Sequence, residues 1–176
     1  MDSRLSILEK EHTKLEDAYS ELLLDAAENL RIDIYNLESD CSTHANHFLD
    51  VALFASDAGL LVNKSELLVK ELKAEIATDV RSKPEDYGIV KLTEGQVMEA
   101  VDSADYAKEV RSLRAECWSL KNNADALVQA FEHRRSMLNN EVSLYLSKLS
   151  EPQAGAKRKD IEKTIGERKR VRRLKK

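Results

Sequence analysis

One long apolar stripe constrains this chain more than any other feature of its sequence. Between Asp105 and Leu149 apolar residues recur in steps of 4 and 3, and the stretch contains neither Pro nor Gly. The stripe consists of Tyr106, Val110, Leu113, Cys117, Leu120, Ala124, Leu127, Phe131, Leu138 and Tyr145. This spacing predicts a single α-helix about 65 Å long, because each helical residue advances the chain by ~1.5 Å. A helix of that length needs a partner to cover its apolar face.

Two charged residues interrupt the stripe near its end. Arg134 and Glu141 occupy the seam positions on either side of Leu138, where the pattern calls for apolar side chains. A charge at such a position must be paired or stay in contact with water. We therefore expect the first half of the helix to be core, and the charges of its second half to be satisfied by a partner or by water.

A second long helix, between Tyr35 and Ser82, is predicted as the partner. A break near Ser42 and Thr43 is possible in it. Its seam repeats at the same steps through Val51, Ala55, Ala58, Val62, Val69, Leu72 and Ile76, with Ser65 at the missing position. Pro84 and Gly88 indicate a turn over residues 83–92, which would fold the two long helices into an antiparallel hairpin.

Shorter elements complete the predicted fold. Residues 3–29 are expected to form a first helix with an acidic outer face, and Thr93 to cap a short helix that has Gln96 in its first turn. Gly59, inside the second helix, indicates either a close backbone neighbour or a bend. The predicted class is all-α: an elongated antiparallel long-helix hairpin with an extra N-terminal helix and a flexible basic tail, assembled into an oligomer.

The composition supports this class. Aromatic residues make up 5% of the chain and charged residues 34%, with only 5 Gly and 2 Pro, which favours elongated helices over sheets. Cys41 and Cys117 lie far apart, as expected of reduced, packed thiols in a cytoplasmic protein. No apolar run approaches the ~18 residues of a membrane span, and the acidic start does not resemble a signal peptide.

The charge is divided between an acidic body and a basic arm. Residues 157–176 contain 11 Lys and Arg against 3 Asp and Glu, a net charge of +8, although the whole chain carries −4. We expect three parts: an acidic N-terminal helix (1–34), a helical hairpin core (35–150) and a basic, largely disordered tail (151–176), with Pro152 and Gly155 in a linker.

The sequence offers little catalytic chemistry. It contains no Gly-rich phosphate loop, no nucleophile elbow and no clustered Cys ligands. His44 and His47 share a helical face, but a surface histidine pair is a simpler interpretation than a metal site. We expect no enzyme activity, no metal and no cofactor.

Basic residues are the best candidates for binding. Each phosphate that Lys or Arg neutralises releases a counterion, so a cluster of them binds polyanions additively. Arg111, Arg114 and Lys121 add positive charge to the long helix, and Tyr87 and Trp118 are the candidates for base stacking. The predicted contacts in the body are Lys64, Lys70, Lys73, Arg81, Lys83, Lys91, Arg134 and Arg135; those in the tail are Lys157, Arg158, Lys159, Arg168, Lys169, Arg170, Arg172 and Arg173.

Residues 49–149 also resemble a known protein family, and this resemblance makes the expected polyanion binding more specific. The run KPEDYGIVKLTEGQV, the step MEAVDSADY and the later ALVQAFEHRRSML make residues 49–149 similar to the UvsY-type recombination mediators of phages. Lys91, Thr93 and Glu94 match one motif, and Arg134 and Arg135 another. The resemblance implies a closed homo-oligomer, such as a ring, in the host cytoplasm, and makes the second half of the long helix, with its Arg pair, a surface for assembly or for DNA. Such a protein binds single-stranded DNA, contacts the single-strand binding protein and the recombinase, and loads the recombinase without hydrolysis of its own. The longer acidic N-terminus and the detached basic tail depart from the family pattern.

Two other classes stay open. A viral scaffolding or assembly protein is also an acidic helical hairpin with a basic, coat-binding C-terminus. Alternatively, Lys157 and Arg158, a ten-residue spacer and the cluster from Lys169 form a bipartite nuclear localisation signal. That pattern would suit a nuclear coiled-coil adaptor.

Overall fold

The computed structural model describes residues 3–173, and the side chains of residues 3–149. Its elements are α1 (Ser3–Asn29), α2 (Leu37–Ser82), the short 3₁₀ helix η1 (Pro84–Tyr87), α3 (Glu94–Ser103) and α4 (Asp105–Arg173). No strand occurs among the described residues, and the expected all-α class is confirmed.

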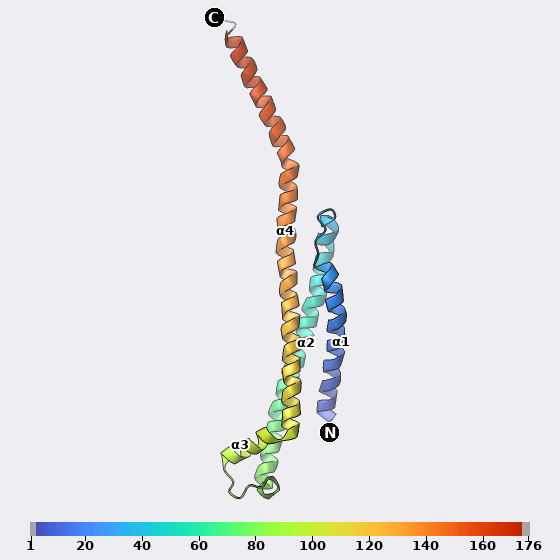
Figure 1. Cartoon of the computed structure of the whole chain (residues 1–176), viewed down its shortest axis with the longest axis vertical. Helices are drawn as coiled ribbons and strands as arrows, with labels where there is room; N and C mark the ends of the chain where they lie inside the picture. The colour runs from blue at the N-terminus through green and yellow to red at the C-terminus, as the bar shows by residue number, and fades with distance from the viewer. Residues whose placement is uncertain (1–2, 174–176) are drawn as a thin grey trace.

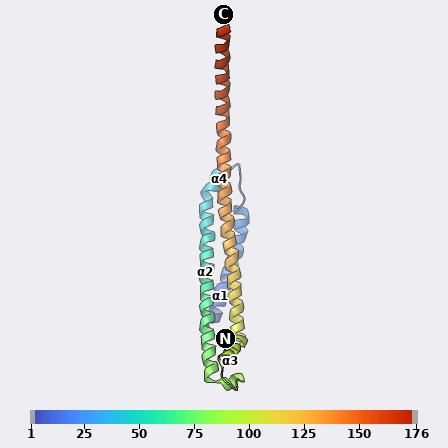
Figure 2. The same cartoon turned by 90° about the vertical axis from the view of Figure 1, so that its left-hand side faces the viewer.

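Three helices lie side by side along one axis. α1 runs beside α2 in the opposite direction, and α4 returns along α2 from the end where η1 and α3 connect them (Figure 1). The view turned by 90° shows the same arrangement and shows that α4 continues far past the end of α2 (Figure 2). With 69 residues, α4 is about 100 Å long at ~1.5 Å per residue.

The seam between α2 and α4 forms most of the core. The stripe of α4 from Val110 to Leu138 is buried at each apolar position, and Val51, Ala58, Val62, Val69 and Leu72 of α2 are buried opposite it. Matching steps of 4 and 3 on two antiparallel helices allow their side chains to interdigitate along the whole contact. Ser65 fits among these residues because its hydroxyl donates to the carbonyl of Val62 at 2.7 Å.

α1 covers one side of this pair. Leu5 and Leu8 belong to the same core cluster as α2 and α4, and the ring of Tyr19 packs on Phe54 with a centroid separation of 5.6 Å. Ion pairs line the margin, including Arg4 with Glu75 at 2.8 Å. Such exposed pairs contribute about 0–1 kcal/mol each, so apolar burial provides most of the attachment.

The connection between α2 and α4 has its own small core of Ala77, Val80, Val97 and Val101. The predicted cap is confirmed, since the Thr93 hydroxyl accepts the backbone N–H of Gln96 at 3.4 Å. Gly88 ends η1 with φ of +68°, a left-handed conformation that favours glycine.

The structure differs from the sequence-based expectations in three places. α2 is continuous through Ser42 and Thr43, whose hydroxyls both donate to the carbonyl of Ser39. Cys41 is exposed, so only Cys117 is a packed thiol. The backbone of α4 is helical to Arg173, across the linker expected at Pro152 and Gly155, which accords with the high helix propensity of the Lys, Arg, Glu and Ala that surround them.

No helix among the described residues combines the length and the apolar character needed to cross a membrane.

Gly59 lies within α2, and the space around it shows whether packing requires a glycine at this position. A Cβ built at this position would lie 3.8 Å from Lys121 Cε, an ordinary contact, so neither a close backbone neighbour nor lack of space requires the glycine. We expect Gly59→Ala to stabilise the protein by about 0.5–1 kcal/mol, because alanine loses less conformational freedom in a helix. Thermal unfolding followed by circular dichroism measures the gain.

Gly88→Ala is the matched control, and we expect it to lower the stability of the protein. Space is also available at Gly88, but the positive φ strains any residue with a Cβ. A lower melting temperature for Gly59→Ala would indicate that the helix needs its flexibility at this point.

Candidate nucleic-acid interface

Four of the eight basic residues predicted as contacts in the body form exposed ion pairs with carboxylates of the same chain. These pairs are exposed, so they are weak and can open. A phosphate that binds at one of them must nevertheless replace a carboxylate that is already there. The pairs are Lys64 with Glu11 at 2.7 Å, Lys73 with Asp102 at 3.1 Å, Arg81 with Glu94 at 2.9 Å and Lys83 with Asp79 at 3.7 Å.

Three predicted contacts, Lys70, Lys91 and Arg135, are exposed and form no ion pair with another described residue. They do not form one patch, because Lys70 lies on α2, Lys91 in the loop before α3, and Arg135 near the opposite end of the bundle. The structure therefore leaves these cations available but does not gather them.

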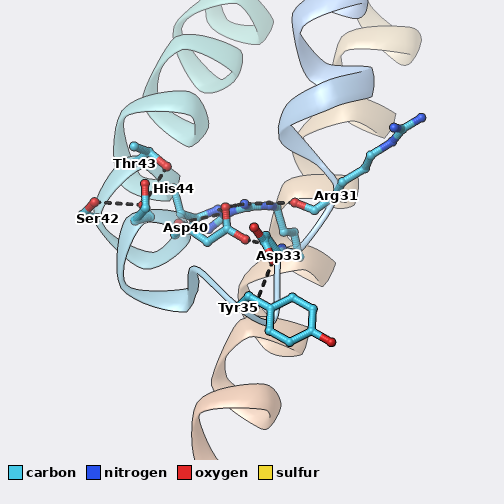
Figure 3. A network of polar contacts seen from close by, with 9 residues as sticks. Arg31, Asp33, Tyr35, Asp40, Ser42, Thr43 and His44 are labelled. Carbon is cyan, nitrogen blue, oxygen red and sulfur yellow. Dashed lines mark hydrogen bonds and ion pairs between the residues drawn. The ribbon is translucent and has the colours of Figure 1, made fainter. Parts of the chain in front are cut away.

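Arg134 is a correction to the prediction. Its side chain is 3% exposed and contacts Asp40 and His44 at the start of α2 and Arg31 in the chain that links α1 to α2. Figure 3 labels these three partners. One terminal nitrogen, Nη2, lies 3.1 Å from Asp40 Oδ1 and donates to the carbonyl of Arg31 at 3.3 Å. In this arrangement Arg134 closes the end of the core and is not a phosphate contact.

The other terminal nitrogen of Arg134, Nη1, completes the network. It lies 3.2 Å from His44 Nδ1 and donates to the Asp40 carbonyl at 3.4 Å, while the Nε has no partner among the described residues. Asp40 also accepts the backbone N–H of Asp33 at 2.7 Å, which fixes the α1–α2 link. One buried charge thus connects three parts of the chain that are remote in sequence.

The surroundings of His44 oppose its protonation. Its ring stacks on Phe131 with centroids 6.1 Å apart, and burial, followed by the positive charge of Arg134, lowers its pKa below the usual 6.5. The surface histidine pair expected at His44 and His47 is therefore wrong, because His44 is buried.

Of the two free thiols, Cys117 is buried in the core and Cys41 is exposed. Burial raises the pKa of the Cys117 thiol to about 11, which keeps it protonated near neutral pH. Residues 3–149 contain no group of three or more His, Cys, Asp and Glu side chains that could hold a metal ion.

A second surface combines an aromatic ring with arginines. Trp118 is 39% exposed on the outside of α4, and with Arg111, Arg114 and Asn122 it lines a shallow depression with a volume of about 560 Å³. The guanidinium of Arg111 is held by Asp102 at 3.1 Å, whereas Arg114 is exposed. In the sequence, steps of 3 and 4 place Arg111, Arg114 and Trp118 on one helical face, away from the apolar seam. This pattern could have identified the surface before the structure was known.

Tyr87, the other candidate for base stacking, is held by a hydrogen bond to α2. The Tyr87 hydroxyl donates to Asp79 Oδ2 at 2.7 Å, and this hydrogen bond raises its pKa. The ring remains 39% exposed at the tip of the connection.

The basic arm lies on the far part of α4. From Leu138, the last buried residue of the stripe, to Arg173 the helix advances about 50 Å at ~1.5 Å per residue. The side chains from Lys157 to Arg173 lie outside the described side chains, so the predicted contacts there stay predictions.

The chain matches no protein-family model, no curated protein and no solved structure.

Removing the charge that pairs with Arg134 should unfold the end of the bundle. We expect Asp40→Asn to destabilise the protein by about 3 kcal/mol, because it leaves a guanidinium buried without a counter-charge. Denaturant unfolding measures the loss. Asp50→Asn, a charge removal at an exposed residue of α2, serves as the control and should change stability by less than about 0.5 kcal/mol.

A double variant separates this effect from simple disruption. Adding Arg134→Met to Asp40→Asn removes the unpaired charge, so we expect most of the stability to return. If the double variant were as unstable as Asp40→Asn, polar packing around Asp40 would matter more than the charge.

Stability should also fall at mildly acidic pH. A histidine whose pKa is lowered on folding binds its proton more readily in the unfolded chain. The contribution of neutral His44 to the free energy of unfolding is therefore fully present above pH 6.5. It is lost as the pH falls from 6.5 toward the pKa of His44 in the folded protein. The slope is at most about 1.4 kcal/mol per pH unit.

The measurement compares the wild type with His44→Gln between pH 7.5 and 5.5 by denaturant unfolding. The variant should show a flatter dependence because position 44 no longer titrates. Equal slopes in the two proteins would mean that the acid sensitivity arises elsewhere.

Proposed function

We propose that this chain is a non-enzymatic protein that binds single-stranded DNA through the basic end of α4. The observation that carries the proposal is the position of the basic residues 157–173. They lie on the part of α4 that extends past the bundle, here called the α4 extension (residues 139–173), and so away from the acidic body.

The charge of this segment gives the physical reason. Residues 157–176 carry +8, and like charges so concentrated gain most when they meet a polyanion. Each phosphate contact adds affinity by counterion release, without any need for a shaped pocket. A projecting helix suits this mode of binding because it can lie along a phosphate backbone.

The body offers weaker candidates for the same role. Lys64, Lys73 and Arg81 are engaged by neighbouring carboxylates, and Arg134 is buried. The exposed Trp118 with Arg114 is a further place where a base could stack, but it lies about 60 Å from Lys157 along α4 at ~1.5 Å per residue. The extension is thus the stronger candidate.

The biological role follows from the resemblance to UvsY-type mediators. In that role the protein would bind single-stranded DNA, contact the recombinase and the single-strand binding protein, and help the recombinase replace the latter. All of these steps are binding events, so the role requires charged and apolar surfaces and no catalytic group.

A scaffolding or assembly protein is the second candidate. Leu144, Tyr145, Leu146 and Leu149 are each more than half exposed on the α4 extension. DNA phosphates do not require such an aliphatic surface, whereas a protein partner does. This candidate requires the basic end to bind an acidic protein instead of DNA.

The test is binding of a labelled single-stranded oligonucleotide at several salt concentrations. Deleting residues 157–176 should weaken binding and flatten the plot of log affinity against log salt. The slope should fall by about 0.7 for each phosphate that the protein no longer neutralises, a change of several units in all. The control is Lys73→Gln with Arg81→Gln, which removes body charges that are already paired and should leave the slope almost unchanged.

Two results would contradict the proposal. An unchanged slope after deletion would move the site to the body, and the control variant would then locate it. Absence of binding by the full chain at low salt would favour the scaffolding role.

A further inference from the structure

A groove with an apolar floor runs between α1 and α2 on the outside of the bundle. Leu53, Leu60 and Leu67 of α2 follow one another at intervals of seven residues, and each is 57% exposed. Ile7 of α1, also 57% exposed, faces the lower end of this row. Leucines at heptad spacing on an exposed helix face are the pattern of a helix that packs against another helix.

Two depressions make up the groove, and the exposed Lys64–Glu11 ion pair, 2.7 Å long, crosses it where they meet. One depression, of about 660 Å³, is lined by Leu53 and Leu60 together with Ala18 of α1. A second, of about 330 Å³, is lined by Leu67 and Ile7. Both reach Glu11 and Lys64, so the depressions adjoin each other and form what we call the α1–α2 groove.

A second unpartnered apolar surface lies on the α4 extension. Val142, Tyr145 and Leu149 follow one another in steps of 3 and 4, and Val142 continues the stripe past Leu138, which is buried in the seam. Tyr145 is 54% and Leu149 56% exposed, since α2 begins only at Leu37 and leaves this part of α4 uncovered. Exposed apolar surface of this extent marks an interaction site.

The charges beside the two surfaces are opposite. Residues 16–60 contain one Arg and no Lys against ten Asp and Glu, a net charge of −9. They include Asp50 and Asp57 of the upper depression, which Lys14 and Lys64 also line. Residues 157–176, which follow the apolar stripe of α4, carry +8. α4 points away from its own bundle (Figure 1), so the basic segment of one chain is directed away from that chain's own acidic surface.

We propose that residues 142–149 of one copy dock in the α1–α2 groove of a second copy. The stripe from Val142 to Leu149 spans about 10 Å and the leucine row from Leu53 to Leu67 about 21 Å at ~1.5 Å per residue, so the groove can hold the whole stripe. Charge complementarity sets the direction: the docked helix lies parallel to α1, which brings its basic segment toward the acidic end of the groove.

Because the two surfaces differ, this contact is head-to-tail. Each copy offers one groove and one extension, so repetition builds a chain of copies or a closed ring and not a symmetric pair. The apolar contact uses residues other than those proposed to bind DNA, and only its direction depends on the basic segment. Loss of self-association in a variant of the apolar surfaces and loss of DNA binding after deletion of residues 157–176 are therefore separate results.

Two single variants test the pairing. Leu60→Glu places a charge in the groove, and Leu149→Glu places one on the stripe; both residues are more than half exposed, so the fold should survive. We expect the wild type to self-associate and each variant to be a monomer of 20.0 kDa by light scattering or sedimentation. Leu24→Glu is the control, because Leu24 is an apolar residue of α1, 74% exposed, that does not line the groove.

Mixing the two variants provides the decisive measurement. The intact extension of Leu60→Glu can dock in the intact groove of Leu149→Glu, whereas the reverse contact is blocked at both surfaces. The mixture should therefore form a species with twice the mass of one chain and nothing larger.

Other outcomes overturn the proposal. A wild type that stays monomeric at all concentrations would exclude the contact. Loss of association in Leu149→Glu alone, with no recovery on mixing, would indicate symmetric pairing of two extensions. Association that persists in both variants would place the interface on another surface.

Discussion

The apolar seam between α2 and α4 is the interaction on which the rest of the structure depends. It fixes two long helices side by side, and α1 can cover them only because they already form a surface with a groove. Buried side chains such as Phe131 and Leu127 would each cost several kcal/mol if truncated to alanine, far more than any of the exposed ion pairs. The position of α3, the course of the α1–α2 link and the direction of the α4 extension all follow from this seam.

Arg134 shows how the seam ends. An apolar residue at this position would remove a donor to the Arg31 carbonyl of the α1–α2 link, whereas the guanidinium contacts this carbonyl as well as the carbonyl and the carboxylate of Asp40. Buried charges of this kind seldom add net stability, but they do specify register. A slip of one helical turn between α2 and α4 would separate Arg134 from Asp40 and leave both charges unpaired.

The sequence predicted the seam because periodicity is local information: steps of 4 and 3 can be counted along each helix without knowledge of its neighbour. The sequence did not predict the burial of Arg134, because its partners Asp40 and His44 lie 94 and 90 residues away in the chain. The ion pairs of the lysines in the body could not be predicted from the sequence for the same reason. Lys64 is exposed, as expected, but only the packing of α1 on α2 brings Glu11 to it. A signal was available for Arg134, since Asp40 and His44 are four residues apart and so share one face of α2.

The projecting length of α4 determines how the molecule behaves in solution. A compact domain of 176 residues has a radius of gyration of about 16 Å, whereas a rod as long as α4 has one of about 30 Å. A single copy therefore diffuses slowly and leaves a gel-filtration column early, as a considerably heavier globular protein would. Elution volume alone would mimic self-association, and small-angle scattering could distinguish one long molecule from several short ones.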